Sequence, residues 1–314
     1  MLTYQQMRAP TGAAETKGVP LMTELIFGVG IPTAAGPGDD PVALAREAER
    51  LGYDFVSAAD HPCGPDPNLH TPTMLTWIAA HTSRIVVATR VMAVPFRRPA
   101  MVAKMAASLD LLSGGRFILG LGGGYVDEEI RALGGPVPSA RAKVDGLAEA
   151  TRVIRGAWTE SGFGYTGEHY SAHDLTMEPK PGRRIPVWMG TFGPRALRVT
   201  GELADGWIPS LGFAEPADLP AMRRRVDDAA RAAGRDPAEI RGVFNVRIRV
   251  DPDAAPAPDI VAGSRVQVLD RLRAYLELGF GGLSFIPAGP DRADQFRRIA
   301  EGIIPDLRNS VPVP

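Results

Sequence analysis

The chain has 314 residues, of which 45% are hydrophobic and 23% are charged, and its formal net charge is −1. This composition is typical of a soluble globular protein, and the near-neutral charge gives no electrostatic reason to expect nucleic acid or an anionic membrane as a partner. No apolar run approaches the roughly eighteen residues needed to span a bilayer. The single cysteine, Cys63, excludes an internal disulfide and favours a cytoplasmic protein.

The first residues lack the apolar segment of a signal peptide. Residues 1–23 are predicted to be a flexible N-terminal extension, and Met22 is an alternative natural start. We expect one domain over residues 24–308, followed by a short tail over 309–314.

From residue 25 onward, predicted strands and helices alternate. Short apolar runs predict the strands, and apolar residues at three- and four-residue spacing between start and stop signals predict the helices. The strands are expected at Leu25–Ile31, Asp54–Ala59, Ile85–Val91, Arg116–Leu121, Pro186–Gly190, Gly206–Ser210, Gly242–Val250 and Gly282–Pro287. The helices are expected from Pro41, from Thr71, from Pro99 and after Ser139, and then over Pro194–Leu203, Leu219–Ala233, Arg265–Leu278 and Ala293–Leu307.

Two of these segments carry more detailed predictions. In the helix from Pro99, one apolar face is expected to consist of Met101, Val102, Met105, Leu109 and Leu112. Residues 160–185 are rich in glycine, proline and turn formers, so we expect an insertion there, with a β-hairpin lying over one end of the barrel.

Eight strands and eight helices in alternation predict an α/β fold, a (β/α)8 TIM barrel, because a closed barrel leaves no exposed strand edge. A doubly wound open sheet is the alternative, and the absence of a dinucleotide fingerprint near the start disfavours it. In a barrel, catalytic groups come from the carboxyl ends of the strands, which meet at one mouth.

Three strand ends carry residues suited to chemistry. Asp60 and His61 follow the second strand, and they are either a proton-transfer pair or a polar pair that caps the following turn. The glycines of residues 120–124 follow the fourth strand, where they allow close approach of a flat ligand or simply form a tight turn. Tyr125 takes the place of the third glycine of a Rossmann fingerprint.

The loop of residues 190–195 joins the fifth strand to a helix and ends at Arg195. It is either a phosphate site at a helix N-terminus or an ordinary turn with proline at the first helical position. The five histidines show no zinc-type spacing, so no metal is expected. Cys63 is either a reactive thiol or a passive wall residue.

Together these stretches resemble the luciferase-like monooxygenase superfamily, and within it the branch of coenzyme F420-dependent oxidoreductases. The resemblance is carried by Asp60 and His61, by residues 89–125 and by residues 185–210, and it extends over most of residues 24–305. It implies a TIM barrel that holds the deazaflavin ring in its mouth, with the tail of the cofactor running toward solvent.

The resemblance also implies roles for individual residues. A non-proline cis peptide bond that backs the ring corresponds to Arg90–Val91, although the family usually has a small residue at the first position. Asp60 matches an acid that faces the ligand, and His61 matches a histidine near the reactive carbon. The remaining cofactor positions are Gly122, Gly123, Gly124 and Tyr125 along the ring, and Phe192, Gly193 and Pro194, with Ser210 nearby, at the tail phosphate. Family members that oxidise sugar phosphates have a glutamate where this chain has Tyr125, so that substrate is not transferred.

The expected function is therefore hydride transfer between F420 and a small organic substrate, with His61 exchanging a proton and Asp60 orienting the ring or the substrate. An FMNH2-dependent monooxygenase of the same superfamily is the first alternative, and a non-catalytic flavin-binding barrel is the second. Family members are often homodimers, and the resemblance implies the same here.

Overall fold

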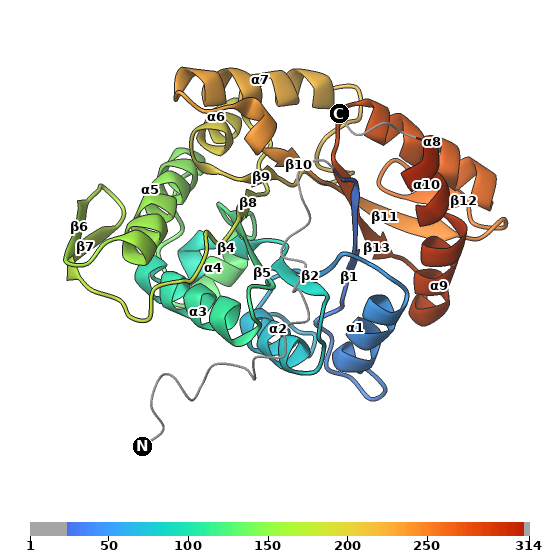
Figure 1. The fold of residues 1–314 in the computed structure, drawn as a ribbon, viewed down its shortest axis with the longest axis horizontal. Helices are drawn as coiled ribbons and strands as arrows, with labels where there is room; N and C mark the ends of the chain where they lie inside the picture. Colours follow the sequence, from blue (N-terminus) through green and yellow to red (C-terminus); the bar gives the residue numbers. More distant parts are fainter. Residues whose placement is uncertain (1–23, 311–314) are drawn as a thin grey trace.

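The computed structural model describes residues 24–310, which form a closed barrel of parallel strands surrounded by helices (Figure 1). The barrel strands are β1 (Ile26–Gly30), β2 (Phe55–Ala58), β3 (Val86–Thr89), β5 (Phe117–Gly122), β8 (Val187–Met189), β9 (Gly206–Trp207), β10 with β11 (Arg241–Gly242 and Phe244–Val250) and β13 (Gly282–Pro287). The surrounding helices are α1 (Pro41–Arg50), α2 (Thr71–Ala80), α3 (Pro99–Leu112), α5 (Ala140–Thr159), α6 (Pro194–Leu203), α7 (Leu219–Ala232), α8 (Arg265–Glu277), α9 (Arg292–Gly302) and α10 (Ile304–Ser310). The predicted (β/α)8 barrel is confirmed.

The ring closes through β10 and β11, which are one strand interrupted at Val243. The N–H of Val243 donates to the carbonyl oxygen of Trp207 at 2.9 Å, and the N–H of Asn245 donates to that of Pro209 at 2.8 Å. On its other side β11 pairs with β13, which pairs with β1. Each barrel strand therefore has two neighbours, and the alternative open sheet is excluded.

Large side chains fill the end of the barrel opposite the mouth, because glycines on the neighbouring strands leave room for them. A Cβ on Gly28 would lie 2.2 Å from the ring of Phe55, and a Cβ on Gly206 would lie 2.3 Å from the ring of Trp188. The interior cluster comprises Ile26, Phe55, Val86, Ala88, Ile118, Trp188, Ile208 and Val243. Most of these residues come from the first half of their strands, so they plug the end of the barrel opposite the mouth.

Capping residues begin the helices where the sequence predicts them. The side chain of Asp40 accepts from the N–H of Ala43 at 2.9 Å, and Ser139 caps α5 in the same way. The predicted last helix is wrong in one respect, because it divides into α9 and α10 at Ile303. Pro305 lacks the N–H that a continuous helix requires, which explains the break.

The predicted buried face of α3 is partly wrong. Met101 is 65% exposed and Leu112 is 76% exposed, whereas the buried residues are Pro99, Val102, Ala103, Ala106, Ala107, Leu109 and Asp110. Small alanine side chains let the helix approach its neighbours closely, so the alanine face is buried and the larger apolar side chains on the other face remain outside.

The insertion at 160–185 contains the predicted hairpin, formed by β6 (Phe163–Thr166) and β7 (Ser171–Leu175). Its predicted place over one end of the barrel is wrong, because it packs against the outer side of α5 (Figure 1). The ring of Phe163 lies on Gly156, where a Cβ would be 2.1 Å away, next to Val153. The missing side chain of Gly156 therefore fixes the hairpin to the flank of the molecule.

Asp205 joins three segments on the outside of the barrel. Its carboxylate accepts from the N–H of Val187 at 2.9 Å, from Arg155 at 2.7 Å and from Arg184 at 2.6 Å. Burial acts to raise the pKa of Asp205, but the two arginines and the backbone N–H outweigh it, so the pKa is lowered. Asp205 is therefore held in its ionised form.

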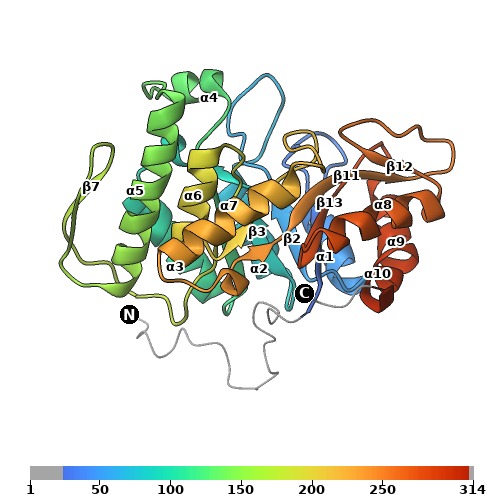
Figure 2. The same ribbon diagram turned by 90° about the horizontal axis from the view of Figure 1, so that it is seen from above.

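The mouth of the barrel lies at the end where the strands finish. Figure 2 shows α4 (Asp127–Ala132), a helix that the sequence did not predict, at the same end as the blue loops that follow β1 and β2. The predicted extension over 1–23 and residues 311–314 of the predicted tail lie outside the described residues. Within residues 24–310, no helix combines the length and apolarity needed to cross a membrane.

Candidate active site

His61 lies in the loop after β2 and is held by a carboxylate from α4. Its Nδ1 lies 3.0 Å and 3.1 Å from the two carboxylate oxygens of Glu129, and its Nε2 lies 3.4 Å from the hydroxyl of Tyr125. The Glu129 side chain is 11% exposed and the His61 side chain is 36% exposed. A neutral His61 that donates from Nδ1 to Glu129 presents an unprotonated Nε2 toward Tyr125, which suits proton transfer.

Tyr125 is the second side chain around the His61 ring, and the two rings pack edge to face at 5.7 Å between centroids. Burial and the nearby charge of Glu129 raise the pKa of the Tyr125 hydroxyl, while Arg90 acts in the opposite direction. Tyr125 therefore keeps its proton at neutral pH and can donate a hydrogen bond.

The side chain of Asp60 lies on the opposite face of the sheet from that of His61. Asp60 continues the alternation of Val56 and Ala58, which face the helices, and its side chain is fully buried. Arg97 donates to both carboxylate oxygens, at 2.6 Å and 3.0 Å, and also lies 2.9 Å from Nε2 of His70. The structure therefore provides Asp60 with a protein partner outside the barrel rather than placing it in the mouth.

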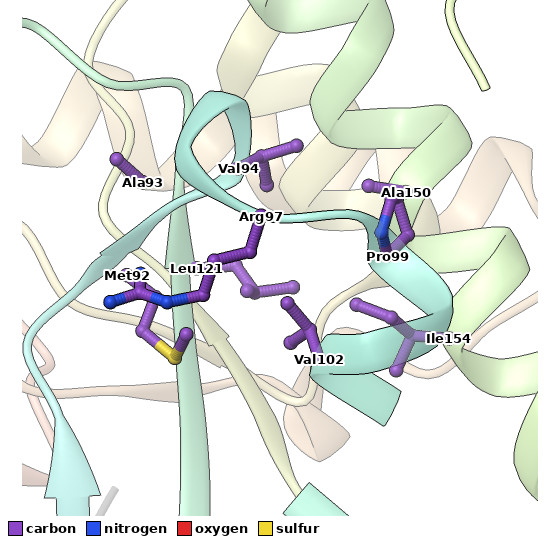
Figure 3. Close-up of a pocket in the computed structure, with 9 residues that line it drawn as sticks. All are labelled: Met92, Ala93, Val94, Arg97, Pro99, Val102, Leu121, Ala150 and Ile154. Atoms are coloured by element: carbon purple, nitrogen blue, oxygen red, sulfur yellow. The ribbon is translucent and has the colours of Figure 1, made fainter. Parts of the chain in front are cut away.

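Arg97 follows β4 (Met92–Ala93) and the short helix η2 (Val94–Phe96). Figure 3 shows its side chain extending toward Met92, along a small cavity that is otherwise lined by apolar side chains, among them Val102 and Ile154. The cavity of about 10 Å³ holds at most one water molecule, so it is no ligand site. Burial, followed by the charge of Arg97, lowers the pKa of His70 despite the opposing effect of Asp60.

The peptide bond between Arg90 and Val91 is cis, as the resemblance implies. Two glycines of the neighbouring strand β5 make room for this bulge. A Cβ on Gly122 would lie 2.7 Å from Cγ2 of Val91, and a Cβ on Gly120 would lie 2.0 Å from the carbonyl oxygen of Thr89. The glycine cluster therefore accommodates the protein's own bulge, an interpretation that the sequence did not suggest.

The other two glycines of the cluster face different neighbours. Gly124 has a φ of +77°, and a Cβ there would lie 3.3 Å from Ala93. A Cβ on Gly123 would lie 3.4 Å from Lys143 of α5. Only Gly122 of the three thus touches Val91, whereas Gly123 and Gly124 turn the chain toward Tyr125 and α4.

Aromatic rings form an exposed rim from His61 across the site. The ring of Phe213 lies 5.5 Å from that of Tyr125 and stacks on that of Phe192 at 5.5 Å. Tyr125 is 67% exposed and Phe213 is 59% exposed. Exposed aromatic side chains in contact with one another favour a planar or apolar ligand.

The loop at the N-terminus of α6 has the predicted turn, with Gly193 as the N-cap and Pro194 at the first helical position. Arg195 does not face this loop as a free charge, because its guanidinium donates to Asp145, with Nε at 2.8 Å. Phe192, Gly193 and Pro194 therefore offer backbone groups and a ring to a ligand, without help from Arg195.

Two buried polar atoms near the mouth, Nε of Arg90 and Oδ1 of Asn245, have no hydrogen-bond partner within residues 24–310. Asn245 is held by its other amide atom, since Nδ2 donates to the hydroxyl of Ser210 at 3.1 Å. Buried polar groups are nearly always paired in folded proteins, so a donor and an acceptor left open in one barrel fit a polar, flat ligand such as a flavin or deazaflavin ring.

Cys63 lies 3.9 Å from the backbone carbonyl oxygen of Glu129 and is half-buried, which suits a residue of the loop wall. Among residues 24–310, no group of three or more histidine, cysteine, aspartate or glutamate side chains is arranged to hold a metal ion.

Comparison with known proteins assigns the chain to a family. Residues 25–277 match the family model described as luciferase-like monooxygenase. The chain belongs to this family. An F420-dependent glucose-6-phosphate dehydrogenase from Microbacterium testaceum (strain StLB037) is 28% identical to it over 307 residues, which cover 83% of this chain and 91% of that protein.

Solved structures share the luciferase-like fold at lower identity. An F420-dependent secondary alcohol dehydrogenase in complex with an F420-acetone adduct has a TM-score of 0.81 at 19% identity, covering 90% of this chain and 98% of that chain. Riboflavin lyase (RcaE) with modified FMN and riboflavin has a TM-score of 0.75 at 14% identity, covering 93% of each chain. At these identities the two structures establish the fold.

Four residues of this luciferase-like site were not predicted from the sequence: Arg97, Glu129, Phe213 and Asn245. An acidic run over residues 127–129 was visible, and such runs are typical of the first turn of a helix. Arg97 follows the end of a predicted strand, so its position in the sequence could also have indicated a site residue. No signal in the sequence indicates that Phe213 lies against Tyr125.

Proposed function

We propose that this protein is an F420-dependent oxidoreductase that moves a hydride between the cofactor and a small organic substrate. The observation that carries the proposal is a histidine at the barrel mouth, fixed through Nδ1 by Glu129. It occurs in a chain that is 28% identical, over 83% of its length, to an F420-dependent dehydrogenase. Such a histidine suits an alcohol–carbonyl reaction, in which a proton accompanies the hydride.

The residues that would hold the cofactor come from four strand ends. Arg90 and Val91 form the bulge at the side of the mouth, and Gly122 packs behind it. The other contributors are Gly123, Gly124 and Tyr125 after β5, Phe192, Gly193 and Pro194 at the start of α6, and Ser210 after β9. When bound, F420 supplies or accepts the hydride, and the protein holds the reacting groups together and excludes water.

His61 acts as the proton acceptor when an alcohol is oxidised and as the proton donor when a carbonyl is reduced. Glu129 holds Nδ1 of His61 and stabilises the protonated ring, which leaves Nε2 for the substrate. The Tyr125 hydroxyl, 3.4 Å from Nε2, can donate a hydrogen bond to the substrate oxygen. Asp60 acts indirectly, because its pairing with Arg97 fixes the start of the loop that carries His61.

The substrate we favour is an apolar alcohol or carbonyl compound rather than a sugar phosphate. Tyr125 and Phe213 present ring surface at the rim of the site, where they are 67% and 59% exposed. An apolar substrate gains more from such a rim than a charged one does.

Titration of the purified protein with F420 and with FMN, followed by fluorescence quenching, tests the cofactor. Tight binding of F420 is expected, whereas binding of FMN alone would favour the FMNH2-dependent monooxygenase. His61→Ala should bind F420 as the wild type does, while turnover falls by about 10²-fold or more. Unchanged turnover would remove His61 from the mechanism, and an absence of turnover in the wild type with all alcohols and carbonyls tried would favour a non-catalytic flavin-binding barrel.

We further propose that the protein is a cytoplasmic homodimer joined through α2 and α3. These neighbouring helices expose four large apolar side chains, Trp77, Met101, Leu111 and Leu112, at 60%, 65%, 45% and 76%. Met101 and Leu112 are three helical turns apart and lie on one face. Replacing both with glutamate should convert a dimer in analytical ultracentrifugation into a monomer, and a monomeric wild type would contradict this proposal.

A further inference from the structure

Arg90 is directed into the barrel rather than toward solvent. It follows Val86 and Ala88, the inward-facing residues of β3, in the alternation of the strand. Its Nη2 lies beside Gly30, since a Cβ on Gly30 would be 3.6 Å from Nη2 and 3.8 Å from the side chain of Ile286. The guanidinium therefore crosses from β3 toward β1 and β13 at the level of the mouth.

The Arg90 guanidinium lacks the partners that a buried arginine of this protein has. Arg90 as a whole is half-buried, and its buried Nε has no hydrogen-bond partner among the described residues. By contrast, Arg116 is buried and donates to the carbonyl oxygens of Ala79, Thr82, Ile85 and Ser113. Among the described residues, no carboxylate supports the charged form of Arg90, and Tyr125, whose charge would support it, is protonated at neutral pH.

Burial lowers the pKa of Arg90 to about 10, and Tyr125 offsets this only in part, so the side chain is still a cation at neutral pH. A cation whose guanidinium is partly buried without a counter-charge is costly, and such groups are usually paired. Retaining one at the mouth of a barrel indicates that an anionic group completes the site when ligands bind.

We propose that Arg90 binds the pyrimidinedione edge of the deazaflavin and thereby holds the reduced cofactor more tightly than the oxidised one. This inference rests on the proposed function, because it assumes that F420 is the cofactor. The guanidinium of an arginine is planar and can donate two parallel hydrogen bonds. It therefore suits a ring edge on which a nitrogen and a carbonyl oxygen are adjacent acceptors, just as it suits a carboxylate. The open Oδ1 of Asn245 supplies an acceptor for a ring N–H, which both redox forms carry.

The preference for the reduced form follows from charge balance. When bound, F420 would accept the hydride from an alcohol, and His61 would accept the hydroxyl proton. Because the proton would go to His61 and not to the cofactor, the cofactor would carry one more negative charge after the transfer. Arg90, which is directed into the barrel, would face this charge. A cation in a partly desolvated site stabilises this charge more than water-exposed cations do.

The test compares dissociation constants of oxidised and reduced F420, measured by calorimetry without oxygen, for the wild type, Arg90→Met and Arg90→Lys. In Arg90→Met the affinity for reduced F420 should fall by about tenfold or more relative to the affinity for oxidised F420. A tenfold change in this ratio corresponds to a shift of about 30 mV in the potential of the bound cofactor. Arg90→Lys keeps the charge and should retain part of the preference, and circular dichroism checks that both variants fold.

The alternatives give different results. Equal changes, or no change, for the two redox forms in Arg90→Met would overturn the inference while leaving the proposed function intact. The inference would also be overturned if Arg90→Met lost the binding of a small carboxylate such as benzoate while both F420 constants stayed the same, since Arg90 would then serve an anionic substrate. Failure of the wild type to bind either form of F420 would overturn both the proposed function and this inference.

Discussion

Replacing Arg97 by methionine tests how the loop that carries His61 is held. Arg97 donates two hydrogen bonds to Asp60, at 2.6 Å and 3.0 Å, and the Asp60 side chain is fully buried while that of Arg97 is 18% exposed. Removing one partner of a buried pair costs about 3–5 kcal/mol, because the other charge stays buried without compensation. The partial exposure of Arg97 places the expected loss near 3 kcal/mol.

Urea unfolding followed by circular dichroism measures this loss as a lower midpoint at an unchanged slope. The double variant Asp60→Leu/Arg97→Met should recover much of the stability, because it removes both charges together. Arg50→Met breaks an exposed pair with Glu47 and serves as the matched control, with little change expected. A loss below about 1 kcal/mol in Arg97→Met, or a double variant less stable than the single one, would refute the idea that this buried pair anchors the loop.

Three further predictions concern the bulge, the histidine and the outer network. Gly122→Ala places a methyl group 2.7 Å from Val91 and should lower the free energy of unfolding by about 1–3 kcal/mol, measured by thermal unfolding. The additional change Val91→Ala should restore most of this stability, and no restoration would mean that the clash lies elsewhere. Glu129→Gln should lower kcat by up to about 10²-fold with F420 affinity unchanged, and equal kcat would show that His61 needs no carboxylate. Asp205→Asn should be less stable than the wild type at pH 7. Because folding lowers the pKa of Asp205, its carboxylate stops stabilising the protein as the pH falls through the pKa of the folded state. The difference in stability between the wild type and Asp205→Asn should therefore shrink below about pH 4. A difference that does not depend on pH would contradict this.

The sequence predicts the barrel well because its strands and caps are local features. The helices α1, α2, α3, α5, α6, α7 and α8 all begin within one residue of a proline or a capping residue that can be read directly from the chain, as at Asp40 and Ser139. The inward face of α3 could not be read in the same way. Both faces of that helix are apolar, and only the packing of neighbouring elements determines that the alanine face is buried while Met101 and Leu112 are exposed.

The candidate site was predictable where it depends on strand ends and unpredictable where it depends on distant contacts. The position of His61 after β2 follows from the barrel rule. Its contact with Glu129 spans 68 residues and requires α4, a six-residue helix too short to show a periodic pattern. The contact between Tyr125 and Phe213 likewise joins two loops that only the folded barrel brings together.

The charges at the ends of β2 and β3 show how strand alternation decides the character of the site. Asp60 and Arg90 end neighbouring strands and could be expected to neutralise each other. The register pairs Ala58 with Thr89, and Asp60 continues the outward alternation of Ala58 whereas Arg90 continues the inward alternation of Ala88. Asp60 therefore meets Arg97 outside the barrel, and the positive charge of Arg90 stays unneutralised inside it. A single-residue slip of β2 against β3 would turn Asp60 inward, toward Arg90, so the register of these two strands keeps the two charges apart.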